Sequence, residues 1–376
     1  MIPFNKPHLI GKEMDYIYDA IYNEGHISGN GKYTKLCQKF FEDRYSFKKC
    51  LLTTSCTDAL EMAAILCGIE NGDEVIVPSF TFVSTALAFV RQGAVIRFID
   101  SRKDHPGMDE ASIEQLITPK TKAIVPVHYA GVACDMDKIM TIASRHNLFV
   151  IEDAAQAIES SYKGKQLGAI GHFGCFSFHE TKNIQCGEGG LLAINDEKFL
   201  KRAEIIWEKG TNRAEFFRGE VNKYSWVDLG SSFLPSDILA AFLYAQCENI
   251  DEIQTKRKKL WHTYFDALNP LSEKGYFKMP IIPDFATNNA HMFYIVCKSQ
   301  EERTNLISYL KANNILSVFH YLSLHKSNFY KEKHDGRVLD KCERIEELLI
   351  RLPIFYELEE SDITIIVNKI KDFYDY

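Results

Sequence analysis

The sequence predicts an α/β protein in which a domain built on a large, mostly parallel sheet is followed by a smaller α+β domain. Up to about residue 249, short apolar runs alternate with helical patterns. Such alternation is typical of a parallel sheet with helices on both faces. Beyond that point, charged helical stretches and short strands replace the alternation. We therefore expect one domain over residues 1–249 and a second over 250–376.

The individual elements follow from the spacing of apolar residues. In the first part we expect a helix over 136–146 and strands over 94–100, 122–127, 148–153, 174–178 and 191–194. In the second part we expect helices over 251–268, 301–313 and 362–374, with a proline-rich link at Pro280 and Pro283.

Composition excludes several classes of protein. Of the 376 residues, 46% are hydrophobic and 25% are charged, which excludes a disordered chain or a membrane bundle. The net charge of -7 and the lack of a basic run argue against binding to nucleic acid or an anionic membrane. The ten cysteines form no C-x-x-C pair, so we expect no metal site. Without an apolar leader or span, the chain is expected to be cytoplasmic, with reduced thiols.

A phosphate site is indicated where the run TTSCTD precedes a helical pattern. Ser55 is suited to cap that helix, and Asp58 lies in its first turn. The free N–H groups and hydroxyls of such a helix start can hold a phosphate, although an ordinary capped helix has the same pattern.

Asp153 ends the apolar run LFVIED and therefore lies at the carboxyl end of a strand. Ligands of open α/β sheets bind at that edge. A carboxylate there can keep a pyridine nitrogen protonated, whereas the plainer interpretation is a helix cap. Because strand side chains alternate, the neighbouring Glu152 should point to the opposite face.

Lys182 follows another buried strand and precedes the glycine-rich run GEGG. A dehydrated lysine near a cationic cofactor can lose its proton near neutral pH and attack an aldehyde. Phe80 and Phe82 stand at period two, on one face, so that either ring could stack on a flat heterocycle or pack in the core. Each feature alone has a structural explanation, but together they match the needs of pyridoxal phosphate.

Two glycine-containing runs do not indicate nucleotide binding. Gly168, Gly171 and Gly174 lack the dinucleotide spacing and precede a strand instead of a helix, which disfavours a nicotinamide-dependent oxidoreductase. The run GNGK at 29–32 matches only part of a phosphate-binding loop, so both runs are interpreted as turns.

The chain resembles the DegT/DnrJ/StrS family of sugar-nucleotide aminotransferases almost from end to end. The motifs that carry the resemblance are GHISGNG, VHYAGVACDMD, SFHETKN, EKGTNRAEFFRG, VFHYLSLH and RLPIFYEL, of which SFHETKN is the most specific. The resemblance implies a fold-type-I, pyridoxal 5'-phosphate-dependent aminotransferase. It also implies a homodimer whose active sites are shared between the subunits.

Within the family, these motifs are most similar to enzymes that form dTDP-4-amino-4,6-dideoxygalactose. The resemblance therefore implies a dTDP-4-keto-6-deoxyhexose and L-glutamate as substrates, and a role in deoxyamino sugar biosynthesis for lipopolysaccharide. A 4-amino-4,6-dideoxyglucose or a 3-amino-3,6-dideoxyhexose product stays open. A sugar dehydratase of this fold is disfavoured because that branch replaces the lysine by histidine. A non-catalytic cofactor-binding homologue is disfavoured because Lys182 and Asp153 are both present.

The resemblance also implies roles for individual residues. Lys182 would bond covalently to the cofactor and move protons, Asp153 would pair with its ring nitrogen, and Gln156 would approach its ring oxygen. The other implied cofactor contacts are Ser55, Cys56, Phe82, Ser177 and His179. The implied contacts to the sugar nucleotide are His320, Tyr321 and His325. Lys209, Arg213 and Arg218 are further candidates for that role because they supply positive charge in an acidic chain.

One departure from the family pattern concerns the motif G-Y-N-Y-R, whose Asn reaches the phosphate of the partner's cofactor. This chain has GSSFL at 230–234, so that Ser232 stands at the Asn position and Leu234 at the Arg position. Ser232 is therefore the candidate for the contact across the dimer.

Overall fold

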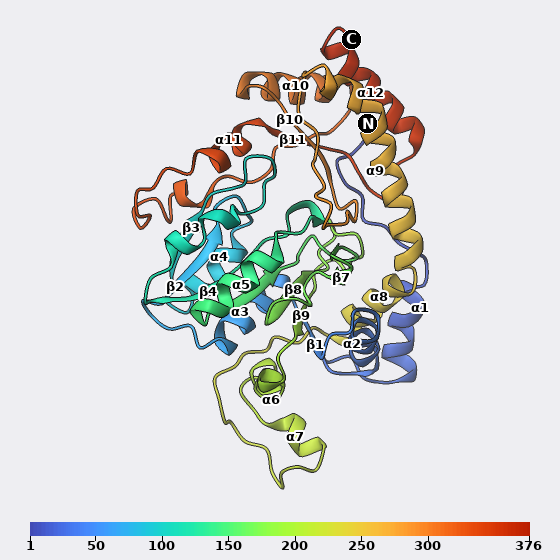
Figure 1. The fold of residues 1–376 in the computed structure, drawn as a ribbon. Coiled ribbons are helices and arrows are strands. Elements are labelled where there is room, and N and C mark those ends of the chain that lie inside the picture. The colour runs from blue at the N-terminus through green and yellow to red at the C-terminus, as the bar shows by residue number, and fades with distance from the viewer.

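The computed structural model describes residues 1–376 and contains one dominant sheet of seven strands (Figure 1). In spatial order, the sheet consists of β1 (Lys49–Thr53), β9 (Gly190–Ile194), β8 (Phe173–Ser177), β5 (Phe149–Asp153), β4 (Thr121–Ile124), β2 (Glu74–Pro78) and β3 (Val95–Ile99). β9 alone runs against the common direction of the other strands, so the predicted mostly parallel α/β sheet is confirmed. None of the helices is both long and apolar enough for a membrane span.

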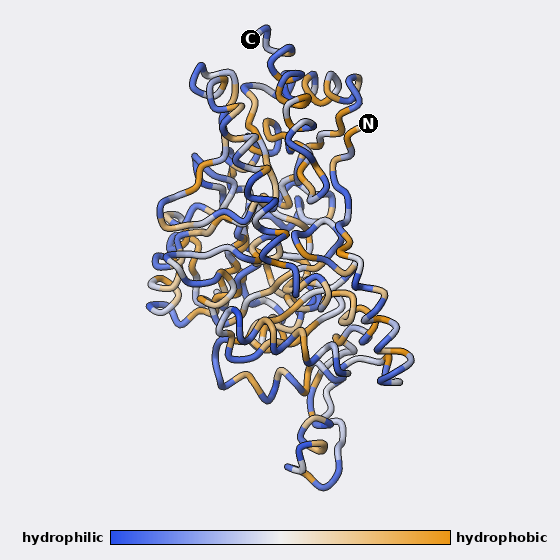
Figure 2. The backbone as a smooth tube through the Cα atoms, turned by 90° about the vertical axis from the view of Figure 1, so that its right-hand side faces the viewer, coloured by the Kyte–Doolittle hydropathy of each residue, from blue (hydrophilic) through white to orange (hydrophobic).

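Helices cover both faces of the sheet because successive strand residues face different cores. In β2, Ile76 belongs to one core and Val75 and Val77 to the other. The first core is completed by side chains from α1 (Glu13–Tyr18), α2 (Lys32–Tyr45), α5 (Met136–His146) and α8 (Asp237–Glu248). The second is completed by α3 (Cys56–Leu66), α4 (Ser84–Val90) and α6 (Leu200–Trp207). Figure 2 shows hydrophobic segments running through the body of the molecule.

Glu152 is fully buried, and its two carboxylate oxygens are occupied by donors from one loop and one histidine. Its Oε1 accepts from the N–H groups of Ile170 and Gly171 at 2.7 and 2.6 Å, and its Oε2 from that of Gly168 at 2.8 Å. His128 Nε2 lies 3.0 Å from Oε2. The glycine-spaced run at 168–174 therefore wraps a structural carboxylate.

The C-terminal part has its own core and also packs on the large sheet domain. It consists of α9 (Ile250–Glu273), β10 (Phe293–Val296), α10 (Gln300–Ala312), α11 (Asp340–Leu348), β11 (Leu349–Leu352) and α12 (Glu360–Phe373). Side chains from α9, α10, α12 and the β10–β11 pair form a third core. The proposed domain boundary between residues 249 and 250 falls between α8 and α9 and stays a prediction.

A segment of residues 208–234, which we call the arm, extends away from the sheet domain and contains α7 (Arg213–Phe217) (Figure 1). The arm exposes large apolar side chains, among them Phe217 at 70%, Trp226 at 82% and Leu229 at 58%. Monomeric proteins rarely expose apolar groups together in this way.

The main difference from the sequence prediction concerns the elements that lead into the site. Strands β1 and β2 were not predicted, and β9 runs against its neighbours. Phe80 and Phe82 lie in an irregular segment instead of a strand, so the expectation that they share one face is wrong. Phe80 is buried, whereas Phe82 is 56% exposed.

Candidate active site

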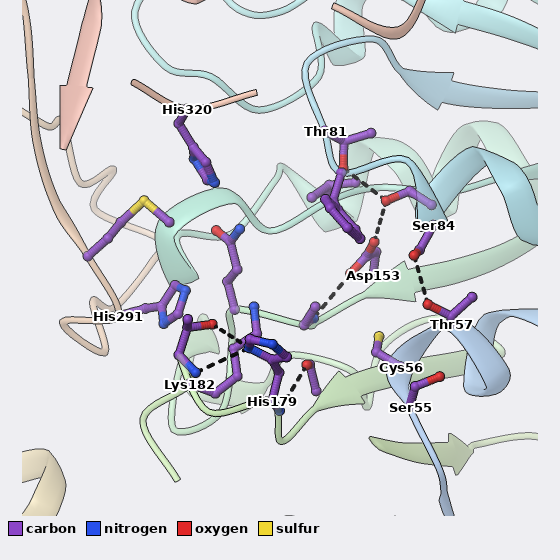
Figure 3. A pocket seen from close by; sticks show the side chains of 18 of the residues that line it. Ser55, Cys56, Thr57, Thr81, Ser84, Asp153, His179, Lys182, His291 and His320 are labelled. Atoms are coloured by element: carbon purple, nitrogen blue, oxygen red, sulfur yellow. Dashed lines mark hydrogen bonds between the residues drawn. The ribbon is translucent and has the colours of Figure 1, made fainter. Parts of the chain in front are cut away.

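One cavity of about 620 Å³ lies where the carboxyl ends of the strands meet the C-terminal part (Figure 3). It collects side chains from the start of α3, the segment 81–85, the end of β5, the loop 177–189 and the C-terminal part. The predicted site residues that line it are Ser55, Cys56, Phe82, Asp153, Gln156, Ser177, His179, Lys182, His320 and Tyr321. Segments far apart in the chain therefore meet at one cavity.

The start of α3 forms the side of the cavity that can hold an anion. Ser55 caps the helix, since its Oγ accepts from the N–H of Asp58 at 3.1 Å. The N–H groups of Cys56 and Thr57 donate to no acceptor within the chain. Gly190 makes this arrangement possible, because a Cβ there would lie 2.3 Å from the carbonyl carbon of Ser55. Free amides at a helix start favour a phosphate.

Asp153 is 6% exposed and lies at the end of β5, on the opposite face from Glu152. Its carboxylate accepts from Thr85 Oγ1 at 2.6 Å and from the N–H of Ala155 at 3.1 Å. Thr81 Oγ1 lies 2.9 Å from Thr85 Oγ1. Burial raises the pKa of Asp153, although these hydrogen bonds oppose the shift. A cation placed beside it would favour the ionised carboxylate.

Lys182 lies in the loop between β8 and β9, across the cavity from the start of α3 (Figure 3). Its backbone N–H donates to the carbonyl of His179 at 2.8 Å, but its Nζ has no hydrogen-bond or ion-pair partner in the chain. Burial lowers the pKa of Lys182, and nearby Asp153 partly opposes that shift. A partly buried, unpartnered amine with a depressed pKa is a ready nucleophile.

His320 and Tyr321, both from the C-terminal part, form another wall of the cavity. His320 Nδ1 lies 2.7 Å from the hydroxyl of Tyr129, and its ring stacks on Tyr321 with the centroids 3.5 Å apart. The hydroxyl of Tyr321 accepts from Gln156 Nε2 at 2.9 Å. Burial lowers the pKa of His320 well below its usual value, so this wall presents a neutral imidazole.

Sequence reasoning missed several residues that line the cavity. Thr81 and Thr85 had no predicted role, although their spacing of four could have indicated a pair on one side. His291 hydrogen-bonds through Nδ1 to Asn183 Oδ1 at 3.1 Å, next to Lys182. Arg351 lies at the start of the motif RLPIFYEL, and no local pattern assigns its guanidinium to the cavity.

Five candidates lie outside the cavity of the single chain. His325 is held by Ser79 Oγ at 2.7 Å and by Glu343 at 3.1 Å, away from the cavity. The other four belong to the arm and are exposed: Lys209, Arg213, Arg218 and Ser232. Arg218 pairs with Glu204 and Glu220.

The cavity fits pyridoxal phosphate on three independent observations. The free amides beside Gly190 suit the phosphate, the buried Asp153 suits a protonated ring nitrogen, and the unpartnered Lys182 suits the aldehyde. Both polar atoms of the Gln156 side chain are held in place. Its Oε1 accepts from the N–H of Ala130 at 2.6 Å, and its Nε2 donates to the hydroxyl of Tyr321.

Comparison with known proteins is consistent with this arrangement. Residues 9–371 match the model of the DegT/DnrJ/EryC1/StrS aminotransferase family. The spore coat polysaccharide biosynthesis protein SpsC of Bacillus subtilis is 30% identical over 380 residues, which cover 99% of this chain and 96% of SpsC.

Solved structures share the whole fold. DesV of S. venezuelae, solved in complex with a ketimine intermediate, superposes with a TM-score of 0.90 at 27% identity and covers 100% of this chain and 99% of its own. Spr1654 of Streptococcus pneumoniae, provisionally named a sugar aminotransferase, was solved in PMP and PLP forms. Its PMP form has a TM-score of 0.92 at 25% identity and covers 100% of this chain and 99% of its own.

Proposed function

Because the chain belongs to the DegT/DnrJ/EryC1/StrS aminotransferase family, we propose that it transfers the amino group of L-glutamate to a dTDP-4-keto-6-deoxyhexose. The protein is a sugar aminotransferase that depends on pyridoxal 5'-phosphate. The proposed products are dTDP-4-amino-4,6-dideoxygalactose and 2-oxoglutarate. The meeting of Lys182, Asp153 and the free amides of α3 at one cavity is the observation that supports this reaction type.

Bound pyridoxal phosphate supplies an aldehyde and an electron-withdrawing ring for carrying an amino group between two substrates. The residues around it have separate tasks. The N–H groups of Cys56 and Thr57 and the hydroxyl of Ser177 would anchor the phosphate, and Asp153 would hold the ring nitrogen protonated. Phe82 would provide the stacking face, while Gln156 would hold the ring oxygen.

Lys182 performs the proton transfers. In the first half-reaction its Nζ removes the proton from Cα of glutamate, and in the second it returns a proton to C4 of the sugar. Its depressed pKa supports this role, because the free amine is more populated near neutral pH than for an exposed lysine. The face from which Lys182 delivers that proton decides between the galacto and gluco products.

We place the sugar nucleotide along the wall made by His320 and Tyr321 and extend its charged end toward the arm. Lys209, Arg213 and Arg218 lie outside the cavity of their own chain. They can therefore contact the sugar nucleotide only from the arm of a partner subunit, and for this reason a homodimer is part of the proposal. The exposed apolar side chains of the arm are the surface expected to be covered. Ser232 at the base of the arm is the proposed phosphate contact across the dimer.

The dimer is tested by sedimentation equilibrium of the holoenzyme and of a Trp226→Asp variant. The natural enzyme should sediment as a dimer, and the charged variant should shift toward monomer, because a charge in an apolar interface is unfavourable. A monomeric natural enzyme with full activity would remove the arm residues from the proposed site.

The reaction is tested by incubating the enzyme with [15N]glutamate and dTDP-4-keto-6-deoxyglucose and identifying the amino sugar by NMR. We expect 15N at C4 and an axial amine, with an equal amount of 2-oxoglutarate. An equatorial amine or an amine at C3 would replace the proposed product with one of the alternatives. The Lys182→Ala enzyme is the control that must give no product.

A further inference from the structure

Arg351 lines the cavity, and its guanidinium has no acceptor from the protein. Its side chain makes no hydrogen bond and no ion pair with any residue of the chain, and its buried Nε is unpartnered. Its Cζ lies 4.7 Å from the centroid of the Phe4 ring, which supports the guanidinium from one side only. A partly buried charge without a counter-charge is costly, and such groups commonly mark ligand sites.

Arg257, a buried arginine of this chain, shows that burial alone does not leave a guanidinium without partners. Arg257 donates from Nε to the carbonyl of Ala290 at 3.2 Å and from Nη2 to that of His291 at 2.8 Å. Arg257 is thus used to hold the backbone, whereas the side chain of Arg351, which lines the cavity, makes no hydrogen bond.

The strand that carries Arg351 fixes its position. Arg351 lies in β11, where its N–H donates to the carbonyl of Val318 at 2.8 Å and its carbonyl accepts from the N–H of Val318 at 3.2 Å. It is also paired with Tyr294 of β10. Such two-sided strand pairing fixes the backbone from which the guanidinium extends before a ligand arrives, and this lowers the entropic cost of binding.

The charges that line the cavity leave one cation for substrate binding. Lys182 and Arg351 are the only lysine and arginine among the lining residues. The His291 and His320 imidazoles are neutral, because burial lowers the pKa of both well below the usual value. The third histidine of the lining, His179, has the carboxylate of Glu188 3.7 Å from its Nε2. Since Lys182 is committed to chemistry in the proposed function, an anionic substrate group has Arg351 as its partner.

We propose that Arg351 binds a carboxylate of the amino donor and thereby selects amino acids over simple amines. A guanidinium suits this task because its planar fork can make two parallel hydrogen bonds to a carboxylate. The 2-oxoglutarate product carries the same carboxylates, so it should bind at the same place. This inference rests on the proposed transamination with glutamate and goes beyond it by assigning the donor site.

The proposal is tested on the cofactor-loaded enzyme, one half-reaction at a time, with Arg351→Met and Arg351→Lys. The matched control is Arg303→Met, because Arg303 also has a buried, unpartnered Nε and lies over an aromatic ring, Phe319, but does not line the cavity. Rapid-mixing absorbance measures the reaction of the PLP form with glutamate and of the PMP form with the keto sugar nucleotide. Calorimetry measures the binding of glutarate, which has both carboxylates but no amino group.

For Arg351→Met we expect roughly 10- to 100-fold weaker saturation by glutamate and a similar loss of glutarate binding, as for a lost hydrogen-bonded ion pair. The limiting rate at saturating glutamate should change little, because the lost contact is made before and during the reaction alike. Arg351→Lys should lose less, since it keeps the charge but not the fork. The control should behave as the natural enzyme in both assays.

Two outcomes would overturn the assignment. If Arg351→Met saturates normally with glutamate but reacts poorly with the sugar nucleotide, Arg351 binds the diphosphate instead. If Arg303→Met loses as much as Arg351→Met, or if Arg351→Met has lost its native near-ultraviolet circular dichroism while Arg351→Lys binds glutarate normally, the role is structural. Failure of the natural enzyme to aminate the keto sugar would refute the proposed acceptor, while the donor half-reaction would still decide the role of Arg351.

Discussion

Replacing Gly190 by alanine tests how closely the sheet must approach the proposed phosphate site. Gly190 is the first residue of β9 and pairs with Thr53 of β1 and Ser177 of β8. An added Cβ would lie 2.3 Å from the carbonyl carbon of Ser55 and 2.5 Å from the nitrogen of Cys56. Both neighbours are backbone atoms at the start of α3, so no flexible side chain can move out of the way.

The size of the effect follows from this geometry. Ordinary contacts of a Cβ begin at 3.4 Å, so the start of α3 and β9 must separate by about 1.1 Å. Such a movement breaks the alignment of at least one N–H group with a phosphate oxygen, and a hydrogen bond to a charged group contributes about 1.5–3 kcal/mol. We expect the affinity for pyridoxal phosphate to fall roughly 10- to 150-fold. Overpacking should also lower the free energy of unfolding by about 1–3 kcal/mol.

The assay is an absorbance titration of the apoenzyme with pyridoxal phosphate, supported by thermal unfolding. Gly187→Ala is the control: Gly187 lies in the same loop region at φ +79° and has no atom within 4 Å of an added Cβ. That substitution strains the backbone by about 1–2 kcal/mol but leaves the start of α3 in place. Equal cofactor affinities for the two variants would refute the argument that Gly190 shapes the phosphate site.

Three further predictions concern the chemistry and the pH dependence. Lys182→Ala should remain folded by circular dichroism but stop turnover, and the yellow colour that borohydride bleaches in the natural enzyme should be absent; near-normal turnover would exclude the proposed role. Asp153→Asn should lower kcat by orders of magnitude, because each ~1.4 kcal/mol of lost transition-state stabilisation costs tenfold; a mild effect would place the partner of the ring nitrogen elsewhere. Burial lowers the pKa of His105 to about 4, so the unfolded chain binds a proton between about pH 6.5 and 4 that the folded chain does not. His105 should therefore lower the free energy of unfolding by about 3 kcal/mol as the pH falls through that window. Between pH 7.5 and pH 4.5, the His105→Asn variant should lose less free energy of unfolding than the natural enzyme. Equal acid sensitivity of the two proteins in chemical denaturation would contradict this.

The sequence was sufficient for those features that depend on local patterns. The helix at 136–146 matches α5 residue for residue, and Ser55 caps α3 as expected. Asp153 and Glu152 point to opposite faces, as strand alternation requires. These outcomes depend on nearest neighbours along the chain, which periodicity and capping rules describe directly.

Features that depend on tertiary packing could not be read in this way. The segment around Phe80 and Phe82 has the alternation of a strand, but it forms the irregular connection into α4. Arg351 and His291 reach the cavity because β11 and the segment before β10 pack against the large sheet domain, and no local spacing encodes that approach. The positions of the arm residues relative to a cavity depend on a second chain, and a single sequence carries no periodic signal for that contact.

The two adjacent acids of β5 show how one strand can separate folding from chemistry. Glu152 is occupied by three backbone amides and a histidine, whereas Asp153 has room for another partner. Substitutions at either position should thus abolish function, but those at 152 should impair folding and those at 153 should impair catalysis. Variants at 152 should accumulate as aggregates in expressing cells, while variants at 153 should be recovered in normal yield as inert protein. An inserted or deleted residue in this strand would exchange the two environments and produce both defects at once.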